Sequence, residues 1–318
     1  MKGFEPRFKD FPDYILKITE EIWEQRRIGS LRDYYADDII IRTPQGISSG
    51  NAGVMAATMQ TLSEFPDRVL LGEDVIWSGS PETGMLSSHR ILSTATHLGD
   101  GVFGPASGTS LTYRAIANCH AIDNKIDDEW LIRDTGAIVR QIGHTPREFA
   151  QSKLDRNEPA EPFIPTINRP GPAAEGGNDD PWGKRYAQAL ERIMRAEFEV
   201  IGTGYDRAIE AHYPGGSDGF GRAFAERHWL GLRSSFPNAS FTVHQRIGQS
   251  GTDSAPRAAL FFALEGLHEG YGAFGPPTGK PVYVMGAAHA EFGPYGIRRE
   301  WVLYDEIAVW LQILSLVR

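Results

Sequence analysis

Two glutamates that each precede a tryptophan, Glu129 and Glu300, are the first candidates for chemistry in this sequence. Both lie in short apolar segments that predict β-strands. A carboxyl group in a dry pocket has a raised pKa and can act as a general acid or base on an acidic carbon. The alternative is a solvated carboxylate near a strand end, or one paired with an arginine such as Arg133 or Arg298.

Polar side chains inside predicted strands form the second set of candidates. His89 and Arg90 are adjacent, and either can stabilise an enolate oxygen if it points into a cavity. Tyr113 and Glu265 also lie inside predicted strands and are candidate cavity contacts. The alternative is that such residues point to solvent, as mid-strand charges usually do.

Other histidines and aromatic residues are weaker candidates for a ligand contact. His97 and His268 each follow a predicted strand, where a structural hydrogen bond explains them equally well. Trp130 and Trp301 fit packing in a core or between sheets as well as they fit a ligand contact. Asp134 and Asp305 suit helix N-caps better than catalysis. The remaining candidate cavity contacts are His97, His268, His289, Trp130 and Trp301.

The chain contains an internal repeat. At one constant spacing, Gly101–Pro105 corresponds to Gly272–Pro276, and Glu129-Trp130 corresponds to Glu300-Trp301, without a gap from about residue 20 to residue 142. A segment rich in proline and glycine separates the copies and predicts an extended linker without helix or strand. We therefore predict a first domain over residues 1–143, a linker over 144–183 and a second domain over 184–318.

Each copy begins with predicted helices and continues with strands. In the first copy the apolar spacing predicts a helix around Tyr14 to Trp23, a short one carrying Tyr34-Tyr35 and a third over 52–63. The predicted strands are 69–76, 85–97, 109–122 and 125–132 in the first copy, and 241–247, 258–268, 282–292 and 297–304 in the second. This pattern predicts an α+β fold of two tandem cone-shaped domains, each a curled antiparallel sheet over N-terminal helices. The mouth of such a cone suits a small ligand.

One stretch of the second copy resembles a known family. Residues 268–280 read HEGYGAFGPPTGK, and EWVLYD follows at 300–305, with Gln312 after it. These landmarks resemble the SnoaL-like polyketide cyclases of the nuclear transport factor 2-like (cystatin-like) superfamily. The first copy matches the loop more loosely, as FGPASG at 103–108.

The resemblance implies a cone fold, dimers through the open sheet faces and aldol ring closure without metal or cofactor. It also places the family's acid/base aspartate at Leu131 and Val302, and its pocket histidine at Ala117 and Ala288. None of these residues can transfer a proton. Glu129 and Glu300, two residues earlier on the same strand face, are the candidate replacements.

Composition narrows the class of protein. The 318 residues carry 32 Lys and Arg against 41 Asp and Glu, a net charge of −9, which argues against nucleic acid or an anionic membrane as partner. We expect no membrane span, because no run of about 18 apolar residues occurs. The single cysteine predicts no internal disulfide, and the histidine spacing indicates no metal site. That no cofactor is needed is implied by the family resemblance. A cytoplasmic protein is expected, since nothing at the N-terminus resembles a secretion signal.

Two functions from different classes remain open. The first is a cofactor-independent cyclase or isomerase acting on a small, partly apolar carbonyl compound. The second is a ligand-binding or scaffold protein that has lost the family's acid/base residues. We expect the copies to pack as a pseudo-dimer, with a homo-oligomer left open. His89 and Arg90 suggest that any anionic intermediate forms in the first copy, and Leu260 and Phe261 suggest an apolar role for the second.

Overall fold

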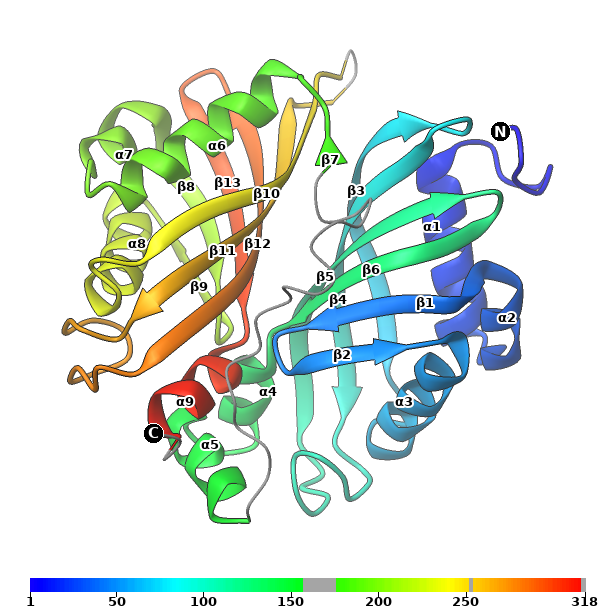
Figure 1. Ribbon diagram of the computed structural model, residues 1–318, viewed down its shortest axis with the longest axis horizontal. Helices are drawn as coiled ribbons and strands as arrows, with labels where there is room; N and C mark the ends of the chain where they lie inside the picture. Colours follow the sequence, from blue (N-terminus) through cyan, green and yellow to red (C-terminus); the bar gives the residue numbers. More distant parts are fainter. Residues whose placement is uncertain (157–175, 252–253, 316–318) are drawn as a thin grey trace.

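The protein is an α+β structure built around two β-sheets, which confirms the predicted fold class (Figure 1). The computed structural model describes residues 1–156, 176–251 and 254–315. We call the part that carries β1–β6 the N-terminal half and the part that carries β7–β13 the C-terminal half. Within the described residues, no helix is both long and apolar enough to cross a membrane.

The N-terminal half begins with a helical layer and ends with two short helices. Its elements are α1 (Phe11–Thr19), the π-helical turn η1 (Glu20–Glu24), the 3-10 turn η2 (Ile28–Ser30), α2 (Leu31–Tyr34), β1 (Tyr35–Thr43), β2 (Gly46–Ser49), α3 (Asn51–Glu64), β3 (Val69–Ser80), β4 (Gly84–Thr96), β5 (Ser110–Ile122), β6 (Lys125–Arg133), α4 (Thr135–Gln141) and α5 (Pro146–Asp155). The predicted third helix and the four predicted strands are present. The short helix ends at Tyr34, so Tyr35 begins a strand instead.

The C-terminal half repeats this order after a different start. Its elements are β7 (Gly176–Gly177), α6 (Pro181–Met194), α7 (Glu199–Gly204), β8 (Tyr205–Tyr213), β9 (Ser217–Phe220), α8 (Arg222–Ser235), β10 (Ser240–Gln249), β11 (Arg257–Leu267), β12 (Pro281–Gly293), β13 (Gly296–Tyr304) and α9 (Glu306–Leu314). Gly50 and Gly221 precede α3 and α8 with φ of 79° and 85°, a conformation that favours glycine. This shared entry aligns the two helices residue by residue.

The two sheets have corresponding strand orders. Among the described strands, the first sheet runs β2-β1-β6-β5-β4-β3 and the second runs β7-β10-β11-β12-β13-β8-β9. The β3–β6 and β10–β13 meanders are antiparallel, as predicted. Each sheet also contains one parallel pair that was not predicted, because β1 pairs in parallel with β6 and β8 with β13. The hairpins β1–β2 and β8–β9 were not predicted.

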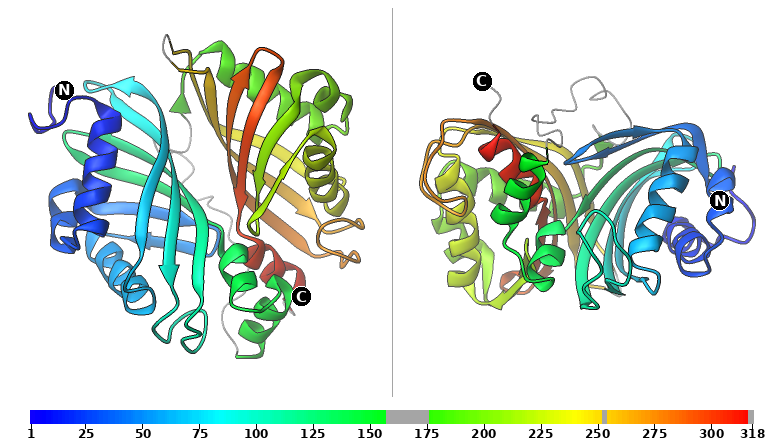
Figure 2. Two further views of the ribbon diagram at one scale, coloured as in Figure 1. Left: turned by 180° about the vertical axis from the view of Figure 1, so that it is seen from behind. Right: turned by 90° about the horizontal axis from the view of Figure 1, so that it is seen from below.

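The sheets face each other, and the layers α1–α3 and α6–α8 cover their outer sides (Figures 1 and 2). A buried apolar cluster joins the facing surfaces, in which the rings of Trp130 and Phe261 lie 4.4 Å apart between centroids. The helices α4, α5 and α9 gather at one end, where the halves also meet. Each sheet thus has one face toward its own helices and one toward the other sheet.

Part of the predicted linker is helical, so the expectation of no regular structure over 144–183 is wrong. Thr145 caps α5 by accepting from the Glu148 backbone N–H, and the Glu148 carboxylate accepts from the Thr145 N–H. Asp180 caps α6 in a similar way, by accepting from Trp182 N–H. Residues 157–175 of the predicted linker lie outside the described residues.

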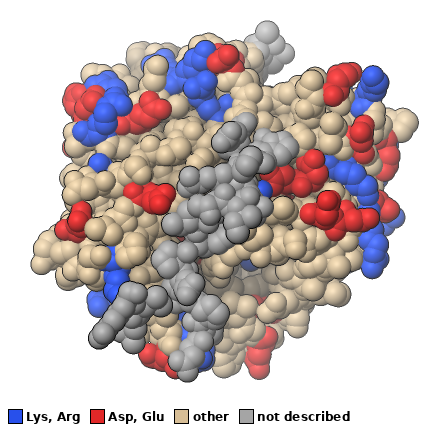
Figure 3. All heavy atoms as spheres, viewed as in Figure 1, with Lys and Arg blue, Asp and Glu red and all other residues tan. Residues whose placement is uncertain are grey.

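Charged side chains are spread over the surface. On the face in Figure 3, Lys and Arg lie close to Asp and Glu around the periphery. The net charge of −9 is therefore not gathered into one patch on this face.

Candidate functional site

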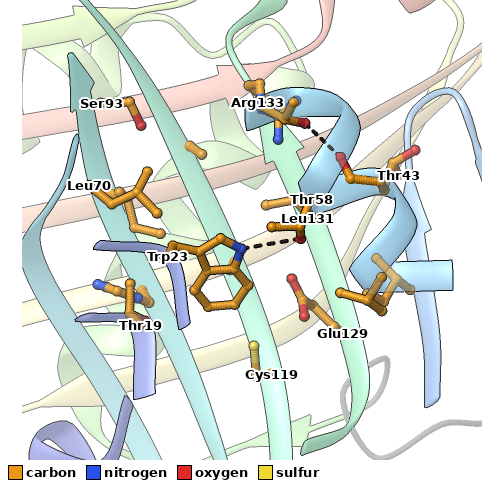
Figure 4. Close-up of a pocket in the computed structure, with 18 of the residues that line it drawn as sticks. Thr19, Trp23, Thr43, Thr58, Leu70, Ser93, Cys119, Glu129, Leu131 and Arg133 are labelled. Carbon is orange, nitrogen blue, oxygen red and sulfur yellow. Dashed lines mark hydrogen bonds between the residues drawn. The ribbon is translucent and has the colours of Figure 1, made fainter. Parts of the chain in front are cut away.

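A cavity of about 310 Å³ lies between the first sheet and its helical layer. Figure 4 shows Glu129 and Cys119 at one end, Arg133 and Ser93 at the other, and Trp23, Thr58 and Leu131 between them. The wall is mostly apolar, with a few polar groups that converge on the interior, as is typical of small-molecule sites. Its ionisable side chains, besides Tyr35, Tyr113 and Cys119, are Arg68, His89, Glu129, Arg133 and Asp305.

Glu129 lies on β6 opposite Cys119 of β5 and beside Ile41 of β1. Its side chain is buried, and burial raises its pKa to about 7, with a smaller contribution from the neighbouring Asp128 charge. A hydrogen bond from the Tyr35 hydroxyl acts in the opposite direction. The Oε2 atom has no hydrogen-bond partner among the described residues. Glu129 can therefore change protonation state near neutral pH and keeps one oxygen free for a ligand.

His89 lies on β4 and pairs with Ala117 of β5, which pairs with Leu131 of β6. His89 is therefore level with Leu131, two residues along β6 from Glu129. Burial, together with the positive charge of Arg90, lowers the pKa of His89 to about 4. The ring is therefore neutral at pH 7. Its Nε2 atom is buried without a partner in the described structure, so it can exchange one hydrogen bond with a ligand.

The far end of the cavity is cationic, a feature that the sequence analysis missed. Arg133 ends β6, and Arg68 precedes β3. Arg68 is only 5% exposed, and its Nε atom has no hydrogen-bond partner among the described residues. Burial lowers its pKa, Arg133 lowers it further, and the nearby Tyr113 hydroxyl acts in the opposite direction. The predicted candidate Tyr113 does line this cavity.

Comparison with known proteins gives the family of this half. The sequence profile of the SnoaL-like polyketide cyclases matches residues 13–142. The N-terminal half is a SnoaL-like domain. A search of curated proteins finds no match.

Solved structures similar to part of the chain carry several names. IdmH of Streptomyces antibioticus, proposed to be a polyketide cyclase, is 20% identical over 42% of this chain and 97% of its own, with a TM-score of 0.37. AclR of Streptomyces galilaeus, proposed to be a hydroxylase, is 16% identical over 42% and 98%, with a TM-score of 0.37. A SnoaL-like polyketide cyclase of Agrobacterium tumefaciens is 22% identical over 41% and 95%, with a TM-score of 0.31.

Within the SnoaL-like domain, the positions that the family resemblance assigned to acid/base residues are now located. Leu131 and Ala117 line the cavity and lie side by side on neighbouring strands. Glu129 lies two residues before Leu131, lines the same cavity and supplies the carboxyl group that Leu131 lacks. His89 pairs with Ala117 on the other side and supplies an imidazole.

Arg90 does not face this cavity, so its assignment as a cavity group is wrong. Neighbouring residues on a strand point to opposite faces, and His89 takes the inner one. The Arg90 guanidinium instead lies 3.6 Å from the Trp301 ring centroid and donates to His289 Nδ1 at 3.0 Å, both in the C-terminal half. Its Nε atom pairs with Glu73 at 3.0 Å.

The hydrogen bonds around His289 form a continuous chain between the sheets. Because its Nδ1 accepts from Arg90, the neutral ring must carry its proton on Nε2, which donates to Ser88 Oγ at 2.7 Å. Ser88 then donates to Asn118 Oδ1 at 2.6 Å, and Asn118 donates to Gln245 Oε1 at 2.5 Å. Burial holds the pKa of His289 well below its usual range. His289, Trp130 and Trp301 thus bind the halves together and line none of the described pockets.

Glu300 lines no described pocket either, which corrects the expectation of a second cavity around it. Its carboxylate is enclosed by four donors: the hydroxyls of Tyr186 (3.0 Å), Tyr205 (2.8 Å) and Tyr213 (2.6 Å), and Trp229 Nε1 (3.2 Å). Burial raises its pKa, and the four hydrogen bonds act in the opposite direction. Glu300 is therefore the centre of a filled polar core.

The other candidates have structural partners. His97 Nδ1 lies 3.0 Å from Ser107 Oγ, and His268 Nδ1 lies 3.1 Å from Thr278 Oγ1, so each holds a loop after its strand. Glu265 is exposed and lines no described pocket. Asp134 and Asp305 are helix N-caps, as predicted: they accept from the N–H groups of Ala137 and of Ile307 and Ala308.

Proposed function

We propose that the cavity of the SnoaL-like domain binds a small, partly apolar carbonyl compound, and that Glu129 is its general acid–base group. The observation that carries this proposal is a buried carboxyl with a pKa of about 7 and one unpartnered oxygen on the wall of a mostly apolar cavity. A base with a pKa near the working pH is effective in proton transfer. The reaction class is a cofactor-free aldol cyclisation or isomerisation.

The proposed steps balance with this chain's own groups. The Glu129 carboxylate takes a proton from the carbon next to a carbonyl, which leaves an enolate and a neutral carboxylic acid. The neutral His89 ring donates an Nε2 hydrogen bond to the enolate oxygen and so stabilises it. In a cyclisation the enolate carbon bonds to a second carbonyl carbon, and Glu129 returns its proton to the new alkoxide. In an isomerisation the proton returns to another carbon.

Removing the Glu129 carboxylate tests this proposal. The wild type should accelerate the exchange of the C1 protons of 2-tetralone with D₂O, a reaction that NMR follows directly. Glu129→Gln keeps the shape of the side chain and should lower the enzyme-dependent exchange rate by about 100-fold. Glu300→Gln, in the enclosed core, serves as the matched control and should leave exchange unchanged. Loss of exchange in both variants, or in neither, would count against Glu129 as the base.

The pH dependence of exchange should follow the same carboxyl. Only the carboxylate form of Glu129 accepts a proton, and its pKa is about 7. The rate should therefore rise between pH 6 and 8 and level off above about pH 8. His89, with a pKa of about 4, stays neutral over this range and adds no second inflection. A midpoint near the ordinary glutamate value of about 4.3 would show that another base acts.

A non-catalytic binding protein is the second candidate. Leu131 and Ala117 favour it, because at these two positions the cavity wall holds no group that transfers a proton. In that case 2-tetralone binds to the cavity, as calorimetry can detect, while wild type and Glu129→Gln show equally slow exchange.

A further inference from the structure

Two arginines at the end of the cavity away from Glu129 lack a negative partner. Arg68 and Arg133 both line the cavity, and in the part of the chain that the structure describes neither guanidinium forms an ion pair with a carboxylate. Arg68 is 5% exposed, so water can hydrate its positive charge only to a small extent. A buried cation without a counter-charge is unfavourable, and a second cation close by makes it more so.

The carboxyl groups on the cavity wall do not offset these charges. Glu129 lies at the opposite end, as Figure 4 shows. Asp305 is bound by neutral donors: Gln45 Nε2 at 2.7 Å, Thr135 Oγ1, and the N–H groups of Ile307 and Ala308. Among the described lining residues, no carboxylate is therefore left to pair with Arg68 or Arg133.

We propose that the ligand carries a carboxylate that Arg68 and Arg133 bind, while its reacting carbon lies at Glu129. This inference rests on the proposed function, since it names the class of compound that the same cavity takes. Glu129, Leu131 and Arg133 alternate along β6 and all line the cavity. Four residues of strand span about 13 Å. The compound is thus an acid with an apolar body about two fused rings long between its carboxylate and its acidic carbon.

A carboxylate fits this end better than a phosphate does. A guanidinium offers paired N–H donors that match the two oxygens of a carboxylate. A phosphate ester carries up to two charges and three free oxygens, and beyond the two arginines this end offers single hydroxyl groups, such as those of Tyr113, Ser93 and Thr43. Leu70 of β3 pairs with Ser93 of β4, and Ser93 with Tyr113 of β5, so both of these hydroxyl-bearing residues lie in one row of the sheet.

Calorimetry with matched probes tests the inference. The wild type should bind 2-naphthoate at least tenfold more tightly than 2-naphthamide, which has the same body without the charge. Arg133→Met and Arg68→Met should each reduce this ratio to between one and three and leave the affinity for the amide within about twofold. Arg32→Met removes an exposed arginine on α2 and should keep the full ratio. If Arg68→Met does not fold, the less buried Arg133→Met carries the test.

The outcomes separate this inference from the proposed function. Equal binding of 2-naphthoate and 2-naphthamide by the wild type overturns the carboxylate site but leaves a ligand cavity in place. Binding of neither probe overturns both proposals. Tighter binding of 2-naphthyl phosphate than of 2-naphthoate overturns the assignment to a carboxylate. A preference for the acid that persists in Arg32→Met and disappears in Arg133→Met supports it.

Discussion

Glu300→Leu is expected to destabilise the protein by at least about 4 kcal/mol, whereas Glu129→Leu should not destabilise it at pH 8. Leucine at position 300 leaves four buried donors, three tyrosine hydroxyls and one indole N–H, without their acceptor. At position 129 only the Tyr35 hydroxyl loses its partner, beside a cavity that water can enter. The two glutamates occupy corresponding places on β6 and β13, so the difference comes from their surroundings.

Urea unfolding followed by circular dichroism measures both variants. The comparison is best made at pH 8, where the raised pKa of Glu129 makes its charged form a cost to the folded state. Lowering the pH through 7 protonates Glu129 in the folded state first, which removes that cost. The gain in stability of Glu129→Leu relative to the wild type should therefore shrink toward pH 5. An equal loss in the free energy of unfolding of the two leucine variants would show that the hydrogen bonds around Glu300 do not add to stability.

Thr58→Trp is expected to abolish binding in the N-terminal cavity, weakening the affinity for 2-naphthamide by more than 100-fold. Thr58 is the eighth residue of α3 and lines the cavity, while Trp229 is the eighth residue of α8 and donates to Glu300. A tryptophan at position 58 should fill the N-terminal cavity as Trp229 fills the corresponding space beside Glu300, and its indole N–H can donate to the free oxygen of Glu129. Calorimetry measures the loss. Met59→Trp, on the exposed side of the same helix, is the matched control and should bind normally.

The reverse change tests the same argument in the other half. Trp229→Thr should cost about 3–5 kcal/mol, as the removal of a large buried side chain usually does. It should also open a second cavity, so that the stoichiometry of 2-naphthamide binding rises from one to two. A stoichiometry that stays at one, in a variant that remains folded, would show that the core around Glu300 closes again.

The elements of the fold were predictable where local signals were strong. The helical segment around Tyr14 to Trp23, the third helix over 52–63 and the long apolar strands all lie close to where the sequence predicted them. The hairpin β1–β2 was missed because Tyr34-Tyr35 continued a helical pattern, and only the parallel pairing of β1 with β6 makes that segment a strand. The helix α5 was missed because proline and glycine dominate the surrounding segment, although Thr145 and Glu148 form a capping box.

The site was predictable in part, for a physical reason. Alternation along a strand placed Glu129 on the face of Leu131, and it also meant that only one of His89 and Arg90 could face the cavity. The sequence did not say which. Arg133 was considered only as a partner for Glu129, although four residues along a strand hold the two groups apart. Nor could the sequence show that the N-terminal half has a cavity beside its glutamate while the C-terminal half has a packed core there. That difference depends on Thr58 of α3 and Trp229 of α8, which occupy corresponding positions in the two halves.

The contact between the sheets has a consequence for how the two copies depend on each other. In a twofold symmetric dimer, every pair of touching residues occurs twice with the partners exchanged. In this protein Trp130 corresponds to Trp301, and Arg90 corresponds to Phe261. Trp130 packs against the Phe261 ring, whereas Trp301 packs against the Arg90 guanidinium, so one of the two equivalent contacts is aromatic and the other is cationic. Two identical copies of the N-terminal half would bring Arg90 to both places and His289 to neither. Two different halves of one polypeptide can form this asymmetric contact, whereas two identical subunits related by a twofold axis cannot.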